Sequence, residues 1–328
     1  MFDNVNTTDK LFLTVTFPAQ IIRSLLDFHF SYTFPVIRQV ENWYDLLLVY
    51  ANLASSKEIR FKSGGKFLAK KSNISEIITT IEYLDLPSAV REKFFARMEG
   101  KAVSFKMGSK RLKVGVESAR SIISEAYLNT HGGIDVRGRV VLDIGAYIGD
   151  SPIYYALIGN ARHIYALEPN VHLYNLGLEN IKRNGLSQKI SMLNLAASGE
   201  DGSVRIPKSE TNFGEKKIGK GAASERGNYD VIRAISLDSL VAKFKIKDGA
   251  LKIDCEGFEY EIIKGASSAA IKSFQTIHIE YHFGYLDLTK RLISEGYTVS
   301  CTRPKYIFKG FGSRAIIAGD IIANRTNI

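Results

Sequence analysis

The chain has little cysteine and no long hydrophobic run. It has two cysteines in 328 residues, and Cys255 and Cys301 lack the close spacing of a cysteine metal site, so both are expected as reduced thiols. Charged residues interrupt the apolar stretches between Leu11 and Ala54, so none reaches the length of a membrane helix. The first residues lack the basic and apolar regions of a secretory signal. We therefore expect a cytoplasmic protein without stable membrane insertion.

The composition is that of an ordinary globular protein, with 45% apolar and 24% charged residues. A chain of this length exceeds one minimal Rossmann sheet, so one α/β domain with a smaller addition is expected. The net charge of +10 permits acidic partners such as RNA, nucleotides, phosphosugars or anionic membrane surfaces. It establishes none of them, because a generally basic surface explains the same excess.

The N-terminal part, residues 1–116, predicts a mixed α/β accessory region without a chemical motif. Its apolar spacing and turn residues predict helices over 11–54, 74–84 and 87–98, and strand pairs at 57–61 with 66–68 and 101–106 with 111–115.

From residue 117 to 328 strands and helices alternate, which predicts a mostly parallel seven-stranded sheet with helices on both faces. The expected strands are 139–144, 163–167, 190–196, 251–254, 276–281, 298–302 and 315–323. The expected helices are 117–129, 151–158, 172–184, 237–244, 259–273 and 286–296. The last two strands have no helix between them, which indicates one antiparallel edge. A Gly- and Lys-rich insertion, 199–228, is either a lid over the acceptor or a solvated loop.

The loop after the first of these strands has a ligand-binding pattern. It reads D-x-G-x-x-x-G from Asp143 to Gly149, and Asp150 or Ser151 is expected to cap the helix that follows. The G-x-G-x-x-G pattern of nicotinamide dehydrogenases is absent, which disfavours that class. A carboxylate at the loop entrance suits a ligand with an ammonium or sulfonium charge, and S-adenosylmethionine carries both.

Glu168 ends the next strand, where an acidic residue accepts hydrogen bonds from ribose hydroxyls in this architecture. By itself Glu168 could merely cap a loop. Together with the Asp143 loop it predicts a nucleoside ligand.

Four segments resemble the FkbM-type methyltransferases: VLDIGAYIG from Val141, ALEPN from Ala166, LKIDCEG from Leu251 and IHIEYH from Ile277. The resemblance implies a class I Rossmann-like fold and S-adenosylmethionine as methyl donor, with typical O-methylation of sugars and polyketides. It implies cofactor contacts at Asp143, Gly145, Ala146, Tyr147, Gly149, Glu168, Pro169 and Asn170, with Asn194 and Ala196 beside the adenine. The chain departs from the family at Tyr147, where Asn is frequent.

Four polar residues are expected at the acceptor side: Asp254, Glu256, Glu280 and His282. We expect Asp254 or His282 to act as general base, with Glu280 orienting one of them. The structural alternatives are that Asp254 accepts backbone hydrogen bonds, that His282 is an ordinary loop histidine and that Glu256 caps the helix after it.

No metal site is predicted. His278, Glu280 and His282 share one strand face, but the two histidines would lie roughly 13 Å apart, too far for one ion. A divalent metal between Asp254, Glu280 and His282 on neighbouring strands is left open.

The sequence therefore predicts an S-adenosylmethionine-dependent methyltransferase acting on a hydroxyl of a sugar, glycan or other small molecule. An RNA methyltransferase that docks RNA on its basic N-terminal region and a non-catalytic S-adenosylmethionine-binding protein remain alternatives. The oligomeric state and the choice between O- and N-methylation are not predicted.

Overall fold

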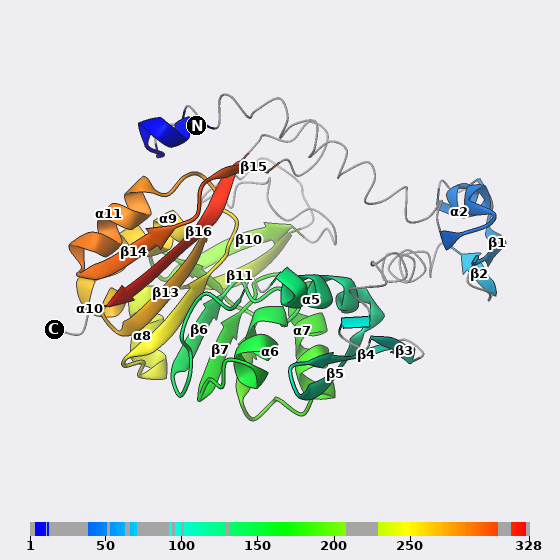
Figure 1. Cartoon of the computed structure of the whole chain (residues 1–328), viewed down its shortest axis with the longest axis horizontal. Helices are drawn as coiled ribbons and strands as arrows, with labels where there is room; N and C mark the ends of the chain where they lie inside the picture. The colour runs from blue at the N-terminus through cyan, green and yellow to red at the C-terminus, as the bar shows by residue number, and fades with distance from the viewer. Residues whose placement is uncertain are drawn as a thin grey trace. The chain divides into compact units, whose positions relative to one another are not determined.

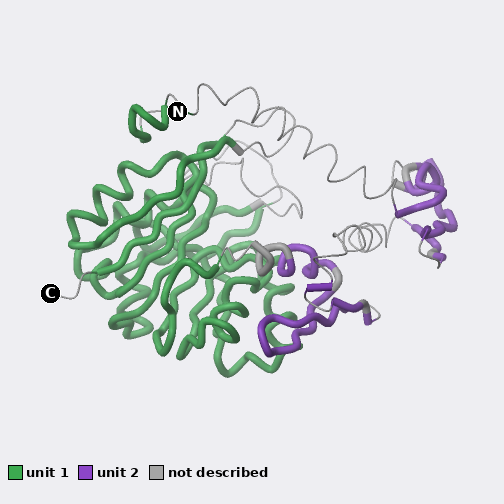
Figure 2. Tube along the Cα trace, in the orientation of Figure 1, with its two compact units in different colours: residues 1–21, 129–328 green, residues 22–128 purple. Residues whose placement is uncertain are grey.

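The chain divides into two compact units, which Figure 2 shows in different colours: residues 1–21 with 129–328, and residues 22–128. The computed structural model describes residues 4–10, 12, 39–50, 53–62, 66–70, 92–93, 96–99, 102–128, 131–207, 229–307 and 316–325. The division of roles expected from the sequence, with an accessory region to residue 116 and a methyltransferase domain from residue 117, stays a prediction.

The unit of residues 22–128 contains two small antiparallel sheets. Its described elements are α2 (Trp43–Tyr50), β1 (Ser56–Arg60), β2 (Lys66–Lys70), β3 (Arg97–Glu99), β4 (Ala102–Met107), β5 (Lys110–Gly115) and α5 (Val116–Leu128). The predicted pairs β1–β2 and β4–β5 are confirmed. The predicted helix 87–98 is wrong at its end, because β3 pairs with β4 and this pairing overrides the local helical pattern.

The larger unit contains the mostly parallel sheet expected from the sequence (Figure 1). Its strands lie in the order β14-β16-β13-β12-β6-β7-β8, and β15 also pairs with β16. Their bounds are β6 (Val140–Ile144), β7 (His163–Leu167), β8 (Ile190–Leu193), β12 (Gly249–Ile253), β13 (Phe274–Tyr281), β14 (Tyr297–Cys301), β15 (Lys305–Ile307) and β16 (Ile316–Arg325). As predicted, the closing strands are antiparallel: β16 runs against both β13 and β14.

The helices connect these strands in two opposite directions. The helices are α6 (Asp150–Leu157), α7 (Val171–Arg183), α8 (Leu237–Phe244), α9 (Glu259–Gly265), α10 (Ser268–Ile271) and α11 (Leu286–Ser294). From β6 the chain passes through α6 and α7 to β8, and from β12 it passes through α9 and α10 to β13 on the other side. Since parallel crossovers are right-handed, opposite directions place these helices on opposite faces of the sheet. The predicted cover on both faces is confirmed (Figure 1).

Two predicted elements are divided in the structure. The predicted strand 190–196 stops at Leu193, and β9 (Ala196–Ser198) then joins a separate sheet with β10 (Gly202–Pro207) and β11 (Tyr229–Ser236). The predicted helix 259–273 breaks at Ala266, whose backbone is extended, and Ser267 caps α10. The predicted insertion 199–228 contains β10, and its residues 208–228 lie outside the described residues, as do those of the predicted helix 74–84.

The centre of the sheet is buried on both faces. All residues of β6 and β12 are buried, as expected for parallel strands between two helical layers. Each fully buried isoleucine or leucine there contributes about 1.5–3 kcal/mol of hydrophobic free energy. No helix in the described ranges is long and apolar enough to cross a membrane.

The first described residues belong to the larger unit and support the start of α11. The Asn4 carbonyl oxygen accepts hydrogen bonds from the backbone N–H groups of Tyr285 and Leu286. The Asn4 side-chain oxygen accepts a third from Asp287 at 2.7 Å. Tyr285 itself gives α11 no side-chain cap, so Asn4 satisfies helix N–H groups that would otherwise lack partners.

Candidate active site

The candidate site lies where the strand order reverses, at the carboxyl ends of β6 and β12. These two strands are parallel neighbours, and the chain leaves them toward opposite sides of the sheet. In open α/β sheets this reversal point is where ligands bind. The sequence-predicted site residues lie at or just after the carboxyl ends of β6, β7, β8, β12 and β13.

The loop after β6 has the close backbone approach that its glycines predict. Gly145 has φ +81°, and a Cβ there would lie 1.7 Å from the carbonyl oxygen of Asp254. Only glycine fits this position, because both the conformation and the contact with backbone exclude a side chain. Gly149, with φ +88°, precedes α6 and acts as its N-cap residue, so the predicted side-chain cap from Asp150 or Ser151 is wrong.

Asp143 lies in a buried charged group beneath this loop. Its Oδ1 is 3.5 Å from Lys252 Nζ, and its Oδ2 accepts a hydrogen bond of 2.6 Å from Ser151. Asp143 and Ala146, both expected to contact the cofactor, are fully buried, and their contact with a cofactor stays a prediction. The Ala146 N–H donates to the carbonyl of Leu167 at 2.9 Å.

Lys252, which the sequence reasoning missed, connects the two halves of the site. Its Nζ lies 3.5 Å from Asp254 Oδ2 and donates a hydrogen bond of 2.8 Å to the Gly145 carbonyl. Burial would lower the pKa of Lys252, but the charges of Asp143 and Asp254 outweigh it and raise this pKa well above its usual value. Lys252 is therefore a cation, fixed between the loop after β6 and the end of β12. A lysine within an otherwise apolar buried strand was the signal in the sequence.

Glu168 holds the loop from the end of β7. Its Oε2 accepts from the Tyr147 N–H at 2.9 Å, and its Oε1 from the Asn170 N–H at 2.8 Å. The side chain is 6% exposed. Burial raises the pKa of Glu168 to about 7, although both backbone hydrogen bonds oppose the shift. Tyr147, with φ +48°, is exposed beside it.

The remaining cofactor candidates surround the end of β7. Asn170 is buried and caps α7 by accepting from the Leu173 N–H at 3.0 Å. Asn194 donates to the carbonyl oxygens of Glu168 and Pro169, both at 3.0 Å. These bonds turn the chain after β8 toward β7 and bring Asn194 beside Glu168. Ala196 is buried in the neighbouring strand β9.

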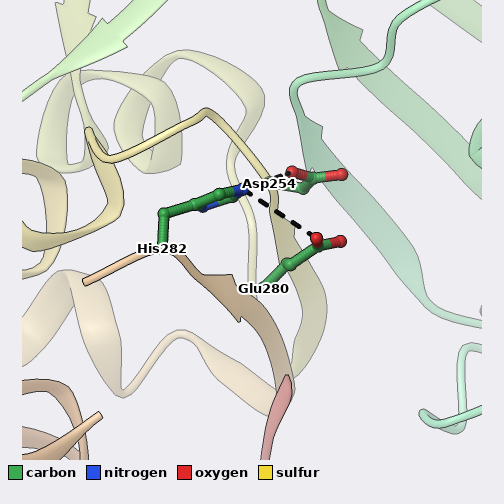
Figure 3. Close-up of side chains that lie close together, drawn as sticks. All are labelled: Asp254, Glu280 and His282. Carbon is green, nitrogen blue, oxygen red and sulfur yellow. Dashed lines mark ion pairs between the residues drawn. The ribbon is translucent and has the colours of Figure 1, made fainter. Parts of the chain in front are cut away.

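On the acceptor side, the structure brings all four predicted residues together around His282 Nε2. Figure 3 shows the side chains of Asp254, Glu280 and His282 pointing toward one another. His282 Nε2 lies 3.9 Å from Asp254 Oδ1 and 3.9 Å from Glu280 Oε1. The carboxylates are 33% and 40% exposed, whereas the His282 side chain is 3% exposed. Ile253 pairs with Ile279, and this register places the residues after them, Asp254 and Glu280, side by side.

A second missed residue, Glu259, positions His282 from behind. Fully buried at the start of α9, its Oε1 lies 3.0 Å from His282 Nδ1 and accepts from the His282 N–H at 2.9 Å. Burial would lower the pKa of His282, but Glu259, Glu256 and Asp254 outweigh it and raise this pKa to about 9. The surrounding carboxylates therefore favour the protonated form of the His282 imidazole. Burial and the Asp254 charge raise the pKa of Glu280.

Glu256, the fourth predicted residue, lies next to this group. Its Oε2 is 3.4 Å from His282 Nε2. The alternative that Glu256 caps α9 is not observed, because the N-cap residue is Phe258 and the Gly257 N–H donates to Glu259. His278 on the same strand as Glu280 pairs instead with Asp320 of β16, at 3.0 Å.

The sheet order, the glycine loop and the polar group at the carboxyl edge are those of a Rossmann-like fold with a ligand site at the point where the strand order reverses. Residues 143–298 match the family model of the methyltransferase FkbM domain. This match confirms the resemblance to FkbM-type methyltransferases that was found in the sequence.

A characterised relative is the hexuronic acid methyltransferase AglP of Haloferax volcanii, 28% identical over 159 residues. The match covers 48% of this chain and 62% of AglP, so less than two thirds of that relative is represented.

Two solved structures resemble the chain at low identity. The methyltransferase FkbM of Methylobacillus flagellatus is 13% identical, with 77% of this chain and 60% of that chain covered and a TM-score of 0.38. TrmK of M. capricolum with S-adenosylhomocysteine is 16% identical, with 61% and 67% covered and a TM-score of 0.38. Neither likeness bears on the substrate.

Proposed function

We propose that the protein is an S-adenosylmethionine-dependent O-methyltransferase whose acceptor is a sugar hydroxyl, on a hexuronic acid or a glycan that contains one. The observation that carries the proposal is that a candidate donor site and a candidate acceptor site lie at the same edge of the sheet. Glu168 with its glycine loop can hold the donor, and Asp254, Glu280 and His282 can receive the acceptor.

The donor half suits an adenosine ligand with a positive charge. Each oxygen of Glu168 already accepts one backbone hydrogen bond and has a further lone pair for a ribose hydroxyl. Asn194 and Pro169 lie beside Glu168, where the adenine would follow the ribose. The carboxylates of Asp254 and Glu280 then face the sulfonium side and favour a cation there.

The acceptor half provides what O-methylation requires. The S–CH₃ bond of the donor breaks as the O–CH₃ bond forms, sulfur keeps the electron pair, and the hydroxyl proton passes to a base. We assign that role to Asp254, because the Asp254 carbonyl lies against Gly145 of the donor loop. Positioning of donor and acceptor supplies several kcal/mol of the rate enhancement.

The sugar acceptor is supported by the similarity to AglP, which concerns only part of each chain. Its test is transfer of labelled methyl groups from S-adenosylmethionine to three acceptor sets: oligosaccharides with hexuronic acid, the same oligosaccharides with the uronate reduced, and total RNA. We expect labelling of the first set, in base-stable form as for an ether. Labelling of RNA alone would replace the proposal with an RNA methyltransferase.

Cofactor affinity is expected to depend on pH through Glu168. In the free protein this carboxyl has a pKa of about 7, and ribose hydroxyls donate to its ionised form. Binding must therefore release a proton below pH 7, so the Kd for S-adenosylhomocysteine rises about tenfold per pH unit as the pH falls below 7 and is constant above it. Calorimetric titrations from pH 5.5 to 8.5 measure this.

The control variant is Glu168→Gln, which keeps a hydrogen-bond acceptor but cannot ionise. Its affinity should be weaker above pH 7 and nearly independent of pH. A wild-type protein with the same flat profile would contradict the assignment of Glu168 to the ribose.

A further inference from the structure

Asp254, Glu280 and His282 have the composition of a metal site as well as that of an acid–base group. One oxygen of each carboxylate and the His282 Nε2 all lie within 4.8 Å of one another. With metal–ligand bonds of about 2.1 Å, two atoms on one ion lie at most about 4.2 Å apart. The two distances from His282 Nε2, both 3.9 Å, are within that limit. The half-exposed carboxylates can close the remaining gap by side-chain rotation.

His282 is oriented as a metal-binding histidine is. Its ring is almost fully buried, and the buried Glu259 holds Nδ1 at 3.0 Å. A carboxylate behind the ring fixes the tautomer that leaves Nε2 as the ligand atom. Within the part of the chain that the structure describes, Nε2 makes no hydrogen bond, although three carboxylates surround it at 3.4–3.9 Å.

The charge at this position also points to a cation. Asp254, Glu256 and Glu280 converge on one imidazole nitrogen, and a fourth carboxylate, Glu259, lies behind it. The nearby lysine, Lys252, is already paired with Asp143 as well as Asp254. Like charges at these distances repel strongly when they are partly buried, and a divalent ion would neutralise them.

We propose that Asp254, Glu280 and His282 bind one divalent metal ion of the first transition row, such as Mn²⁺. Carboxylates suit Mn²⁺ and Mg²⁺, whereas imidazole suits the later metals, so a set with both favours an ion that accepts both. Three protein ligands leave coordination positions open on the exposed side. In the proposed methyl transfer, the acceptor hydroxyl takes one of these open positions, and the metal ion lowers the pKa of that hydroxyl. This catalytic role rests on the proposed function, whereas the binding of the metal ion does not.

The experiment titrates Mn²⁺ into the full chain after chelator treatment and follows the free ion by electron paramagnetic resonance. We expect one bound ion per chain, with a nitrogen coupling from His282 in the pulsed spectrum. Asp254→Asn and Glu280→Gln should each weaken binding by more than about tenfold, and Glu259→Gln by about ten- to a hundredfold.

The matched control is Asp320→Asn, which removes a carboxylate that pairs with His278 of β13 and is not a proposed ligand, so Mn²⁺ binding should stay within a few-fold of the wild type. Binding of S-adenosylhomocysteine by each variant verifies that it is folded. No Mn²⁺ binding to the wild type, or equal binding by the wild type and both ligand variants, would overturn the metal site. Binding of Mn²⁺ without any methyl transfer would overturn the proposed function and leave the metal site intact.

Discussion

Asp254→Asn should reduce methyl transfer by about a hundredfold or more while leaving the affinity for S-adenosylhomocysteine within a few-fold of the wild type. The amide has the size of the carboxylate but can neither accept the hydroxyl proton nor hold a metal ion with comparable strength. The donor contacts assigned to Glu168 and the loop after β6 do not involve the Asp254 side chain. Single-turnover rates with labelled donor, together with calorimetry, separate the two effects.

Asp320→Asn serves as the matched control for this rate effect as well. Asp320 is also a half-exposed carboxylate beside a buried histidine, but its partner is His278. Its substitution should leave the methyl-transfer rate unchanged. If Asp254→Asn retained full activity, the acceptor would bind elsewhere. If it lost donor binding as well, Asp254 would belong to the donor site.

Lys252→Met should destabilise the protein by about 3–5 kcal/mol, the cost of leaving one charge of a buried pair without its partner. Methionine fills a similar volume, so the loss comes from the uncompensated Asp143 carboxylate and the Gly145 carbonyl oxygen without its donor. Urea unfolding followed by circular dichroism measures the change in the free energy of unfolding.

Two further variants test the cause of this loss. The double variant Asp143→Asn with Lys252→Met removes both charges and should recover part of the stability. Lys272→Met breaks a surface ion pair with Glu295 and should cost less than about 1 kcal/mol. A cost for Lys252→Met as small as that for Lys272→Met would show that Lys252 does not hold the loop.

The parts of the site that could be predicted from the sequence depend on local spacing. The glycines at positions 145 and 149 and the glutamate at 168 follow strands with clear β-branched patterns, so their places at the sheet edge follow from the alternation of strands and helices. Asp254 and Glu280 were likewise predicted because each follows or ends a strand. Parallel strands bring such ends to one edge whatever their separation in the sequence.

The parts that could not be predicted depend on register between distant segments. Lys252 faces Asp143 only because β12 and β6 pair at that offset, 109 positions apart in the chain. Glu259 meets His282 because α9 begins directly behind the end of β13. Similarly, the break at Ala266 arises where Gly265 contacts the backbone of Gly199, a contact that no local pattern encodes. The complete burial of Asp143 and Ala146 could not be predicted for the same reason, since burial depends on the packed neighbours.

Titration of S-adenosylhomocysteine into the wild type and into Glu168→Leu at pH 8 tests whether the methyl donor binds between the loop after β6 and the end of β7. We expect one ligand bound per chain by the wild type, and binding at least about a hundredfold weaker in the variant, which loses the charge-assisted hydrogen bonds to the ribose. Absence of binding to the folded wild type, or equal affinity of the two proteins, would exclude a donor site at Glu168.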